Sequence, residues 1–536
     1  MRNFLKYKKR VEDYDFHIED LSENTNAPDI EKMEKVDKSL DKNLKYAKQV
    51  FHMPLNSDII FRNFDITMDE KVFKAFLIVC DGLANTESIN ECVLKPFMYL
   101  RHIHNENDEK LEDFIERKLL PQRQVTKSED INDILKKVNF GFCVLFVDTV
   151  SKGFIIDLKG WEHRGVDTPQ NESIILGPHE AFNEMLRTNT ALIRKTINSP
   201  DLIMEMETLG KVSKTPASVA YIKGIVNENL LKEVKYRIEN IDVDYILTAL
   251  DLEQYIEDDT FALVPQILST ERPDRVCNAL IQGKIAIVVS GSPNVLVLPS
   301  TFFDFLKTAD DEYLRYPFNL VSRTLRFTAV FLSLFASAIF IAIVNYHEGL
   351  LLTDILFSIE ASRTLVPFPS ILELILMEGA FELIKEAGSR IPSAIGQTLG
   401  IVGGLVLGQA AVAASVVSPI MIIVVATGGI ASFAIPDYSL SLSFRISRFL
   451  YIFGAAIAGF LGILAILFIR LLFLFNVKSF GVPYFVPIAP ITKDSSFEAF
   501  FTFPVWKREA RPGYVKSQNA KKQAKISRVW RYKKDR

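Results

Sequence analysis

PFPSILELILMEGAFELIKEAGSRIP, residues 367–392, is the stretch of sequence that decides how this chain is organised. It is apolar enough to lie in or against a membrane, yet it carries Glu373, Glu378, Glu382 and Glu386. The last three glutamates recur every four residues, so a helix places them in one carboxylate stripe on an apolar rod. The prolines at both ends fit a helix with defined ends. Because an unpaired charge that faces lipid is costly, we expect this stripe to face water.

The composition changes on the two sides of this stretch. The 536 residues are 24% charged and 49% hydrophobic, a mixture that neither a purely soluble nor a purely membrane-embedded protein requires. Four cysteines (Cys80, Cys92, Cys143 and Cys277) all precede the apolar region and form no CxxC pair. Cys80 and Cys143 lie in apolar runs, which predicts buried strand thiols in a reduced, cytosol-like compartment. The first residues lack the apolar core of a signal peptide.

The part before the stretch predicts a charged arm followed by two small α/β subdomains. Residues 1–55 are charge-dense and poor in apolar periodicity, which indicates a flexible arm. Residues 56–159 and 160–318 each combine apolar strand-like runs, ended by turn signals, with segments of helical periodicity. Alternation of strands and helices in both segments favours an α/β fold for each.

No motif in this soluble part indicates an enzyme. The chain contains no phosphate-binding P-loop, no GxSxG and no HExxH sequence, and its seven histidines form no ligand pattern. We therefore expect no catalytic residue, no metal and no cofactor. Basic residues are interspersed with acidic ones, so the sequence carries no footprint of nucleic-acid binding.

Residues 319–480 predict a transmembrane domain with about four spanning helices. The expected spans are 327–346, 395–413, 414–435 with a kink at Pro419, and a long tilted span at 449–475. Residues 350–390 are too polar in part to span simply, so they predict interfacial or re-entrant helices. Arginines before the first span place that side in the cytoplasm. Residues 481–536, Pro-rich and then basic, predict a cytoplasmic tail that is either solvated or in contact with anionic lipid heads.

Glycines recur every fourth residue in the segment 395–413. Small residues at this spacing leave the backbone uncovered on one face of the helix, so another helix can approach closely. One interpretation is a tightly packed helix with no further role, and the other is a pore helix. The packing residues are Gly396, Gly400, Gly404 and Gly408, and the pore-lining candidates are Thr398, Val402, Val406 and Gln409. The carboxylate stripe (Glu373, Glu378, Glu382 and Glu386) is then a vestibule or subunit contact on the outer side, with Arg390 able to pair with Glu386.

Several motifs together resemble the A subunit of the GerA-type spore germinant receptors of endospore-forming bacteria. They are RPDRVCNALIQGKIAIVVSGSPNVLVLPSTFFDF, NYHEGLL, SIEASRTLVPFPSILELILMEGAFELIKEAGSRIP, IGQTLGIVGGLVLGQAAV, SPIMIIVVA, SFGVPYFVPIAP and GPHEAFNEMLRTNTALIRK. The resemblance covers roughly residues 55–512. The family also includes the paralogous spore-stage-V A-operon F protein, which shares these motifs.

The resemblance implies a multi-pass protein of the spore inner membrane with both termini in the cytoplasm. Its implied partners are further copies of itself, a transporter-like B subunit, a lipoprotein C subunit and membrane lipids. The implied function is an oligomeric, ligand-gated monovalent-cation channel that triggers germination. Three alternatives stay open: the paralogous channel that amplifies the germination signal, a non-conducting scaffold subunit, and a secondary transporter. Absence of an inverted repeat argues against the transporter.

Overall fold

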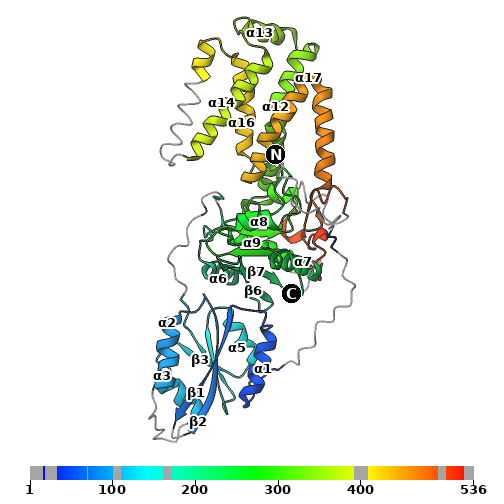
Figure 1. Ribbon diagram of the computed structural model, residues 1–536. Coiled ribbons are helices and arrows are strands. Elements are labelled where there is room, and N and C mark those ends of the chain that lie inside the picture. Colours follow the sequence, from blue (N-terminus) through cyan, green and yellow to red (C-terminus); the bar gives the residue numbers. More distant parts are fainter. Residues whose placement is uncertain are drawn as a thin grey trace, which may run out of the picture.

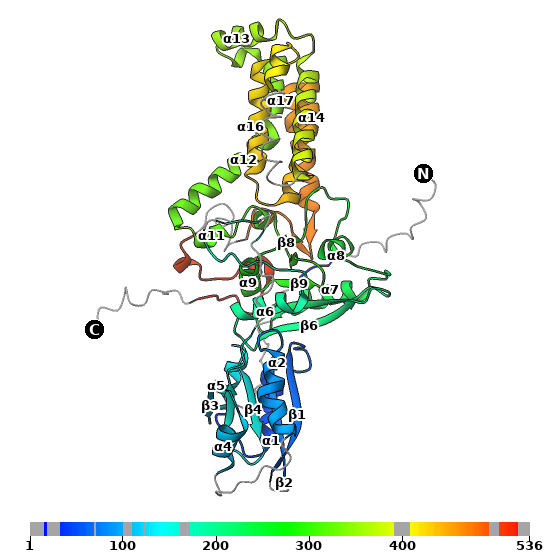
Figure 2. The same ribbon diagram turned by 90° about the vertical axis from the view of Figure 1, so that its left-hand side faces the viewer.

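A computed structural model describes most of the chain. The described residues are 16–18, 33–68, 71–99, 110–122, 124–160, 169, 172–174, 176–390, 408–492 and 503–523. Two α/β subdomains and a bundle of helices are stacked along one long axis (Figure 1). A view turned by a quarter shows the same order, with the second subdomain between the first subdomain and the bundle (Figure 2).

The first subdomain is built on a five-stranded antiparallel sheet. Its strand order is β1-β2-β4-β5-β3, with β1 Ile59–Met68, β2 Lys71–Cys80, β4 Cys143–Val147, β5 Gly153–Ile156 and β3 Val125–Ser128. Alternate residues of β2 and β4 enter two separate cores, one on each face. One core contains the helices α1 (Leu40–Val50) and α5 (Ile131–Val138), and the other contains α2 (Thr86–Ile89), α3 (Lys95–Tyr99), α4 (Leu111–Phe114) and two π-helical segments, Asn90–Leu94 and Ile115–Leu119. Burial on both faces explains the continuous apolar runs of these strands.

The second subdomain repeats this strand order as β6-β7-β9-β10-β8. The strands are β6 Leu202–Leu209, β7 Thr215–Ile222, β8 Leu268–Thr270, β9 Ile285–Val289 and β10 Val295–Leu298. Helices α7 (Glu228–Glu239) and α8 (Ala249–Ile256) cover one face. Helices α6 (Leu186–Thr196) and α9 (Pro273–Ile281) cover the other, and the short helices α10 (Phe302–Phe305) and α11 (Asp310–Tyr313) lead into the bundle. Two α/β units, as expected from the sequence, are thus confirmed.

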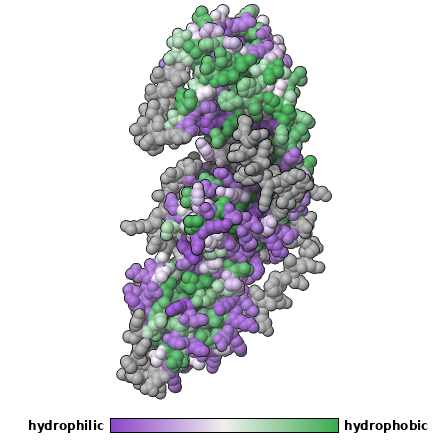
Figure 3. Space-filling model, viewed as in Figure 1, coloured by the Kyte–Doolittle hydropathy of each residue, from purple (hydrophilic) through white to green (hydrophobic). Residues whose placement is uncertain are grey.

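The bundle consists of α12 (Tyr316–Tyr346), α14 (Ser370–Arg390), α16 (Pro419–Phe433) and α17 (Tyr438–Asn476). Of the residues described, α12 and α17 are long and apolar enough to cross a membrane, and α16 is a shorter apolar helix. Apolar side chains gather over the bundle and polar ones over the second subdomain (Figure 3). The division between a soluble and an apolar half therefore holds in three dimensions.

The segment 449–475 is not the single tilted span that its hydropathy predicts. Helix α17 leaves helical geometry at Ala458 and Gly459, and Gly459 has φ +59°. The chain turns back there, so residues 438–457 and 460–476 form two arms of a hairpin (Figure 1). The arms touch backbone to backbone, because a Cβ added to Gly454 would lie 2.8 Å from the carbonyl oxygen of Gly462.

Two features of the apolar half add to the expectations from the sequence. Residues 350–390, predicted as interfacial or re-entrant helices, form two helices: α13 (Thr353–Arg363), preceded by the 3-10 turn Glu348–Leu350, lies across the far end of the bundle, whereas α14 runs along it beside α16 (Figures 1 and 2). Pro419 does not kink a span but occupies the first turn of α16, where its missing N–H costs nothing.

Parts of the two expected tails are folded. Helix α1 lies within the predicted flexible arm 1–55, yet it buries Leu40, Tyr46 and Ala47 against the first sheet. After the two-stranded ribbon β11 (Lys478–Ser479) and β12 (Val482–Pro483), residues 503–523 pack on the second subdomain with the 3-10 turns Val505–Lys507 and Gly513–Val515. There Asn227 donates to the carbonyl oxygen of Lys516 at 2.9 Å.

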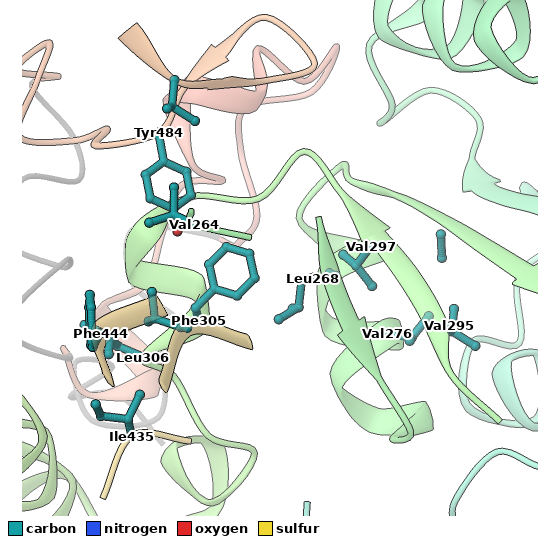
Figure 4. Close-up of a cluster of buried hydrophobic side chains, with 14 of the residues drawn as sticks. Val264, Leu268, Val276, Val295, Val297, Phe305, Leu306, Ile435, Phe444 and Tyr484 are labelled. Carbon is teal, nitrogen blue, oxygen red and sulfur yellow. The ribbon is translucent and has the colours of Figure 1, made fainter. Parts of the chain in front are cut away.

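One apolar core continues from the second sheet into the bundle. It joins strand residues such as Val295 and Val297 to Phe305, Phe444 and Tyr484 (Figure 4). The same cluster extends to buried residues of α12, α14 and α16. The second subdomain and the bundle therefore share one packed interior, and packed interiors transmit strain.

Candidate functional site

The candidate site is the set of ion pairs that α14 makes inside the bundle. Glu378 is fully buried, and its Oε2 lies 2.6 Å from Nη1 of Arg448 on the first arm of α17. Its other oxygen accepts a hydrogen bond of 2.6 Å from the hydroxyl of Ser337 on α12. Arg448 also donates from Nε to the backbone carbonyl oxygen of Ser333, at 2.8 Å. Three helices are therefore joined at one buried charge pair.

A second pair lies one turn further along the same helices. Oε2 of Glu382 accepts from Nε of Arg445 at 2.8 Å and also pairs with Nη2 of that arginine. Further along α14, Lys385 donates to the hydroxyl of Ser432 on α16 at 2.9 Å and lies over the ring of Phe433. We call Glu378, Glu382, Arg445 and Arg448 the Glu–Arg cluster.

Glu373, at the far end of α14, binds the N-terminus of α16 instead of an arginine of α17. Its side chain is fully buried, and one carboxylate oxygen accepts the backbone N–H of Ser418 at 2.5 Å. Ser418 is the N-cap of α16, so the negative charge sits at the positive end of that helix dipole. The second oxygen lies 4.0 Å from Nε of Arg363, at the end of α13. Glu373 thereby links α13, α14 and α16.

The stripe does not face water as a unit, which corrects the expectation drawn from the sequence. Glu373 and Glu378 are buried against partners on other helices, and only Glu386 is exposed. Arginine side chains, rather than water, compensate the negative charges of the buried glutamates. Removing one member of such a buried pair typically costs about 3–5 kcal/mol, because the other charge stays behind without compensation.

The last glutamate of the stripe lies at the sheet-side end of the bundle. Glu386, expected on the outer side, lines a cavity of about 890 Å³ between α14, the start of α17 and the second subdomain. The carboxylates of Glu172, Glu271 and Asp437 line the same cavity, together with Lys385 and Arg445. The sheet-side end of α14 thus borders an acidic cavity. At its far end, the buried Glu373 bonds to the N-terminus of α16.

The glycine-faced helix is described only at its end. Gly408 and Gln409 begin a helical turn in which Gln409 is exposed, and the space around Gly408 is open except for Ile422 at 4.0 Å. The remaining candidates of that helix lie outside the described residues: Gly396, Thr398, Gly400, Val402, Gly404 and Val406. The side chain of Arg390, expected to pair with Glu386, is likewise outside them.

Sequence reasoning missed the arginines that complete the site. Residues 436–448, PDYSLSLSFRISR, have the composition of a polar loop, yet from Tyr438 they form the first arm of α17. Asp437 caps this helix by accepting the N–H of Leu440 at 2.8 Å. Arg445 and Arg448 are three residues apart and so share a helix face, which matches the four-residue spacing of Glu378 and Glu382. The cluster could have been predicted from the sequence by matching the spacing of the two arginines to that of the two glutamates.

Two further buried ion pairs join the three bodies of the molecule. Between the subdomains, Arg194 of α6 donates to Asp58 at 2.5 and 2.8 Å and to Asn56 at 3.0 Å. At the base of the bundle, both oxygens of Asp311 accept from Arg326 of α12, at 2.7 and 2.8 Å. Burial raises the pKa of Asp311, but hydrogen bonds from Arg326 prevail and hold it below its usual value.

Fold and charge arrangement together define the class of this protein. It combines a soluble module of two α/β subdomains with a bundle of apolar helices that carries buried, paired charges. Buried ionisable groups on apolar helices are rare, and where such helices lie in a membrane these groups are typical of functional sites.

Comparisons with known proteins give the family. Residues 45–514 match the family described as Bacillus/Clostridium GerA spore germination protein. The spore germination protein KA of Bacillus subtilis is 36% identical, over 91% of this chain and 89% of its own length. The spore germination protein A1 of the same species is 38% identical over 76% of this chain and 84% of its own length. The chain therefore belongs to the GerA family of spore germination proteins.

Two other similar proteins are a membrane protein and a solved domain. The uncharacterized membrane protein YfkQ of Bacillus subtilis is 38% identical, over 88% of this chain and 90% of its own length. The crystal structure of the N-terminal domain of the A subunit of the Bacillus megaterium spore germinant receptor GerK3 is 28% identical. It covers 51% of this chain and 99% of that domain, with a TM-score of 0.36. KA, A1 and YfkQ are named as germination or membrane proteins, not as enzymes.

Proposed function

We propose that this chain is a membrane subunit of a nutrient germinant receptor and that several copies form a ligand-gated channel for monovalent cations. In this proposal the helix bundle crosses the spore inner membrane, and both termini and both α/β subdomains lie in the cytoplasm. A transporter-like B subunit and a lipoprotein C subunit are the proposed receptor partners. The helix that contains Val402, Val406 and Gln409 is the proposed pore lining.

The observation that carries the proposal is the position of the acidic cavity beside α14. A cation that leaves the pore on the sheet side meets Glu386 and Asp437, with Glu271 opposite on the second subdomain. Rings of carboxylates raise the local cation concentration, and apolar constrictions next to them gate by dewetting. Because α14 precedes the candidate pore helix directly in the sequence, Glu386 lies close in sequence to its first turn.

The internal pairing of Glu378 and Glu382 gives α14 the role of a rigid support. Both carboxylates are held by arginines of α17 within the same protomer. These charges are therefore not available to a passing ion, and they fix α14 against its neighbours. Glu386 is the exposed member of the stripe and lines the acidic cavity, so we assign the cation-attracting role to it.

A route for the gating signal follows from the contacts. Arg194 and Asp58 join the two subdomains, and the continuous apolar core joins the second subdomain to the bundle (Figure 4). Arg326 and Asp311 fix the start of α12 to the same subdomain. A displacement of the soluble module is thus passed to α12, α16 and α17 without a flexible linker.

Ion flux through the purified chain tests the proposal. The wild-type protein is reconstituted in potassium-loaded liposomes next to the variants Val406→Ala and Gln409→Ala. We expect the smaller side chain at position 406 to leak potassium, because it widens an apolar constriction. Leu472→Ala, on the exposed face of the second arm of α17, is the matched truncation control and should not leak. Tight vesicles for every variant, with normal dormancy in spores, would contradict a pore on this helix.

A non-conducting scaffold subunit is the second candidate function. It is favoured by one specific observation, the internal neutralisation of Glu378 and Glu382, which makes a water-filled pore unnecessary to explain these two charges. The flux experiment separates the two functions, because a scaffold assembles with its partners but conducts no ions.

A further inference from the structure

A small cavity at the far end of the bundle is lined by charges of both signs. It has a volume of about 260 Å³ and lies between α13, the end of α12 and the turn that follows α12 (Figures 1 and 2). Glu348, Glu360 and Arg363 are its charged residues. The apolar part of the lining consists of Val344, Leu351, Leu356 and Ile359. This cavity shares no lining residue with the acidic cavity at the sheet-side end.

The charged groups of this cavity are not satisfied by the protein itself. Glu348 and Glu360 are exposed, and among the described residues neither carboxylate has a hydrogen bond or an ion pair. Arg363 forms no hydrogen bond with them either, and its buried Nε lies 4.0 Å from Glu373. Nε is the buried nitrogen of this guanidinium, whereas the side chain as a whole is 26% exposed. The two Nη atoms, which can only donate, are therefore accessible to an acceptor.

The three charges indicate what kind of ligand the cavity fits. A guanidinium binds a carboxylate through two parallel N–H donors, and a carboxylate accepts hydrogen bonds from an ammonium group. One cation and two carboxylates leave the lining with an excess of one negative charge. Electrostatic complementarity then favours a ligand with one carboxylate and two ammonium groups.

The positions of these groups in the fold narrow the ligand further. Glu360 and Arg363 are three residues apart on α13 and share a helix face, which suits the neighbouring ammonium and carboxylate of an α-amino acid. Glu348 belongs to a different element, the turn after α12, and suits a second ammonium at the other end of the ligand. The apolar lining provides a surface for a methylene chain between the two ends, as in most small-molecule sites.

The volume agrees with a ligand of this size. About 260 Å³ corresponds to roughly nine water molecules, each of which takes up about 30 Å³ in the liquid. L-lysine, with about ten non-hydrogen atoms, is comparable to this number. A much larger ligand, such as a peptide or a lipid headgroup with its chains, exceeds the enclosed space.

We propose that the cavity between α12 and α13 binds a basic α-amino acid, of which L-lysine is the simplest example. The ligand carboxylate pairs with the Nη atoms of Arg363, its α-ammonium with Glu360, and its side-chain ammonium with Glu348. The side from which the ligand arrives rests on the proposed function, which puts this end of the bundle outside the cytoplasm. Binding itself does not depend on ion conduction, so a negative flux experiment leaves this proposal intact.

The test measures ligand binding to the full-length chain, purified in detergent, by isothermal titration calorimetry. Cadaverine, which is lysine without the carboxylate, and L-norleucine, which lacks the side-chain ammonium, are the comparison ligands. We expect one L-lysine per chain and affinities lower by roughly tenfold or more for both comparison ligands, because each loses one charged hydrogen-bond pair. L-glutamate should bind far more weakly still, since its second carboxylate meets an acidic lining.

Matched variants locate the binding in this cavity. Glu348→Gln and Glu360→Gln change exposed side chains, so both should fold normally, and each should weaken L-lysine binding by roughly tenfold. Asp354→Asn removes an exposed charge of α13 outside the cavity lining and should bind like the wild type. Arg363→Gln should lose the preference for L-lysine over cadaverine. That preference is a ratio measured on one preparation, so it does not depend on how much of the variant is folded.

Four results would overturn the proposal. They are an absence of saturable L-lysine binding to the wild type, full binding by both glutamate variants, an equal loss of binding in Asp354→Asn, and an unchanged preference for L-lysine over cadaverine in Arg363→Gln. Binding of L-glutamate as tight as that of L-lysine would likewise contradict the assigned charges.

Discussion

The perturbation that probes the architecture most sharply is Arg448→Gln. Its guanidinium is 1% exposed and holds the fully buried carboxylate of Glu378 at 2.6 Å. After the substitution, Glu378 keeps the hydroxyl of Ser337 but no positive charge. Breaking one side of a buried pair costs about 3–5 kcal/mol. At roughly 2–4 °C per kcal/mol for a unit of this size, the apparent melting temperature of the bundle should fall by roughly 6–20 °C.

The assay is thermal unfolding of the detergent-solubilised full-length protein, followed by size-exclusion chromatography of the fluorescently tagged chain. The double variant Glu378→Gln with Arg448→Gln should recover part of the loss, because no charge is then left buried alone. Glu386→Gln is the control on the same helix stripe: its carboxylate is exposed, so its effect should stay below about 1 kcal/mol.

Two results would refute this reasoning. One is a melting temperature of Arg448→Gln that lies within the range of the Glu386→Gln control. The other is strict additivity in the double variant, which would mean that Glu378 and Arg448 are not energetically coupled. Either outcome would imply that water, not the opposite charge, compensates Glu378.

Three further perturbations test other parts of the structure. Gly459→Ala should destabilise the bundle by about 1–2 kcal/mol in thermal unfolding, because the hairpin needs positive φ and a Cβ there would lie 2.9 Å from His347. Gly379→Ala, in open space on α14, is its control and should cost nothing. Burial, reinforced by Glu257, raises the pKa of Glu253 to about 8, so the folded state holds a proton that the unfolded state has lost. The contribution of Glu253 to the free energy of unfolding therefore decreases as the pH rises from about 4.5 to 8. Glu253→Gln should raise the melting temperature at pH 8 more than at pH 5. Truncation after residue 502 should increase hydrogen exchange in the second subdomain, since it removes the fully buried Val515.

The strands that the sequence predicts most clearly are those buried on both faces. Runs such as those of β2, β4 and β9 are continuously apolar and bounded by turns, so their pattern is unambiguous. The sequence pattern does not predict β3, β6 and β8, and all three are edge strands. The sequence of β6, LIMEMETL, contains Met and Glu, which are equally typical of helices, so its pattern does not distinguish a strand from a helix.

The hairpin in α17 could not be predicted from hydropathy. No polar residue marks the turn at Ala458 and Gly459, because its exposed carbonyls are satisfied from another helix. The hydroxyl of Tyr346, at the end of α12, donates to the carbonyl oxygens of Ala456 and Ile457 at 2.7 and 2.8 Å. A turn stabilised by tertiary hydrogen bonds leaves little trace in local sequence.

The sequence predicts the glutamates of the candidate site but not the arginines that pair with them. The periodicity of Glu378 and Glu382 is visible in the sequence, whereas their partners lie more than sixty residues further on, in a segment whose serines and arginines have the composition of a loop. The sequence shows that the charges need compensation, and only the packing of α14 against α17 shows which residues supply it.

The channel function is tested most directly by the conductance of the purified chain in a planar bilayer. We predict that Val406→Ala opens a pathway for potassium and sodium ions, that wild-type protein stays closed without its partners, and that Glu386→Gln added to Val406→Ala lowers the current. An absence of current from the Val406→Ala variant, in a preparation shown to be folded and inserted, would contradict the channel and favour a scaffold.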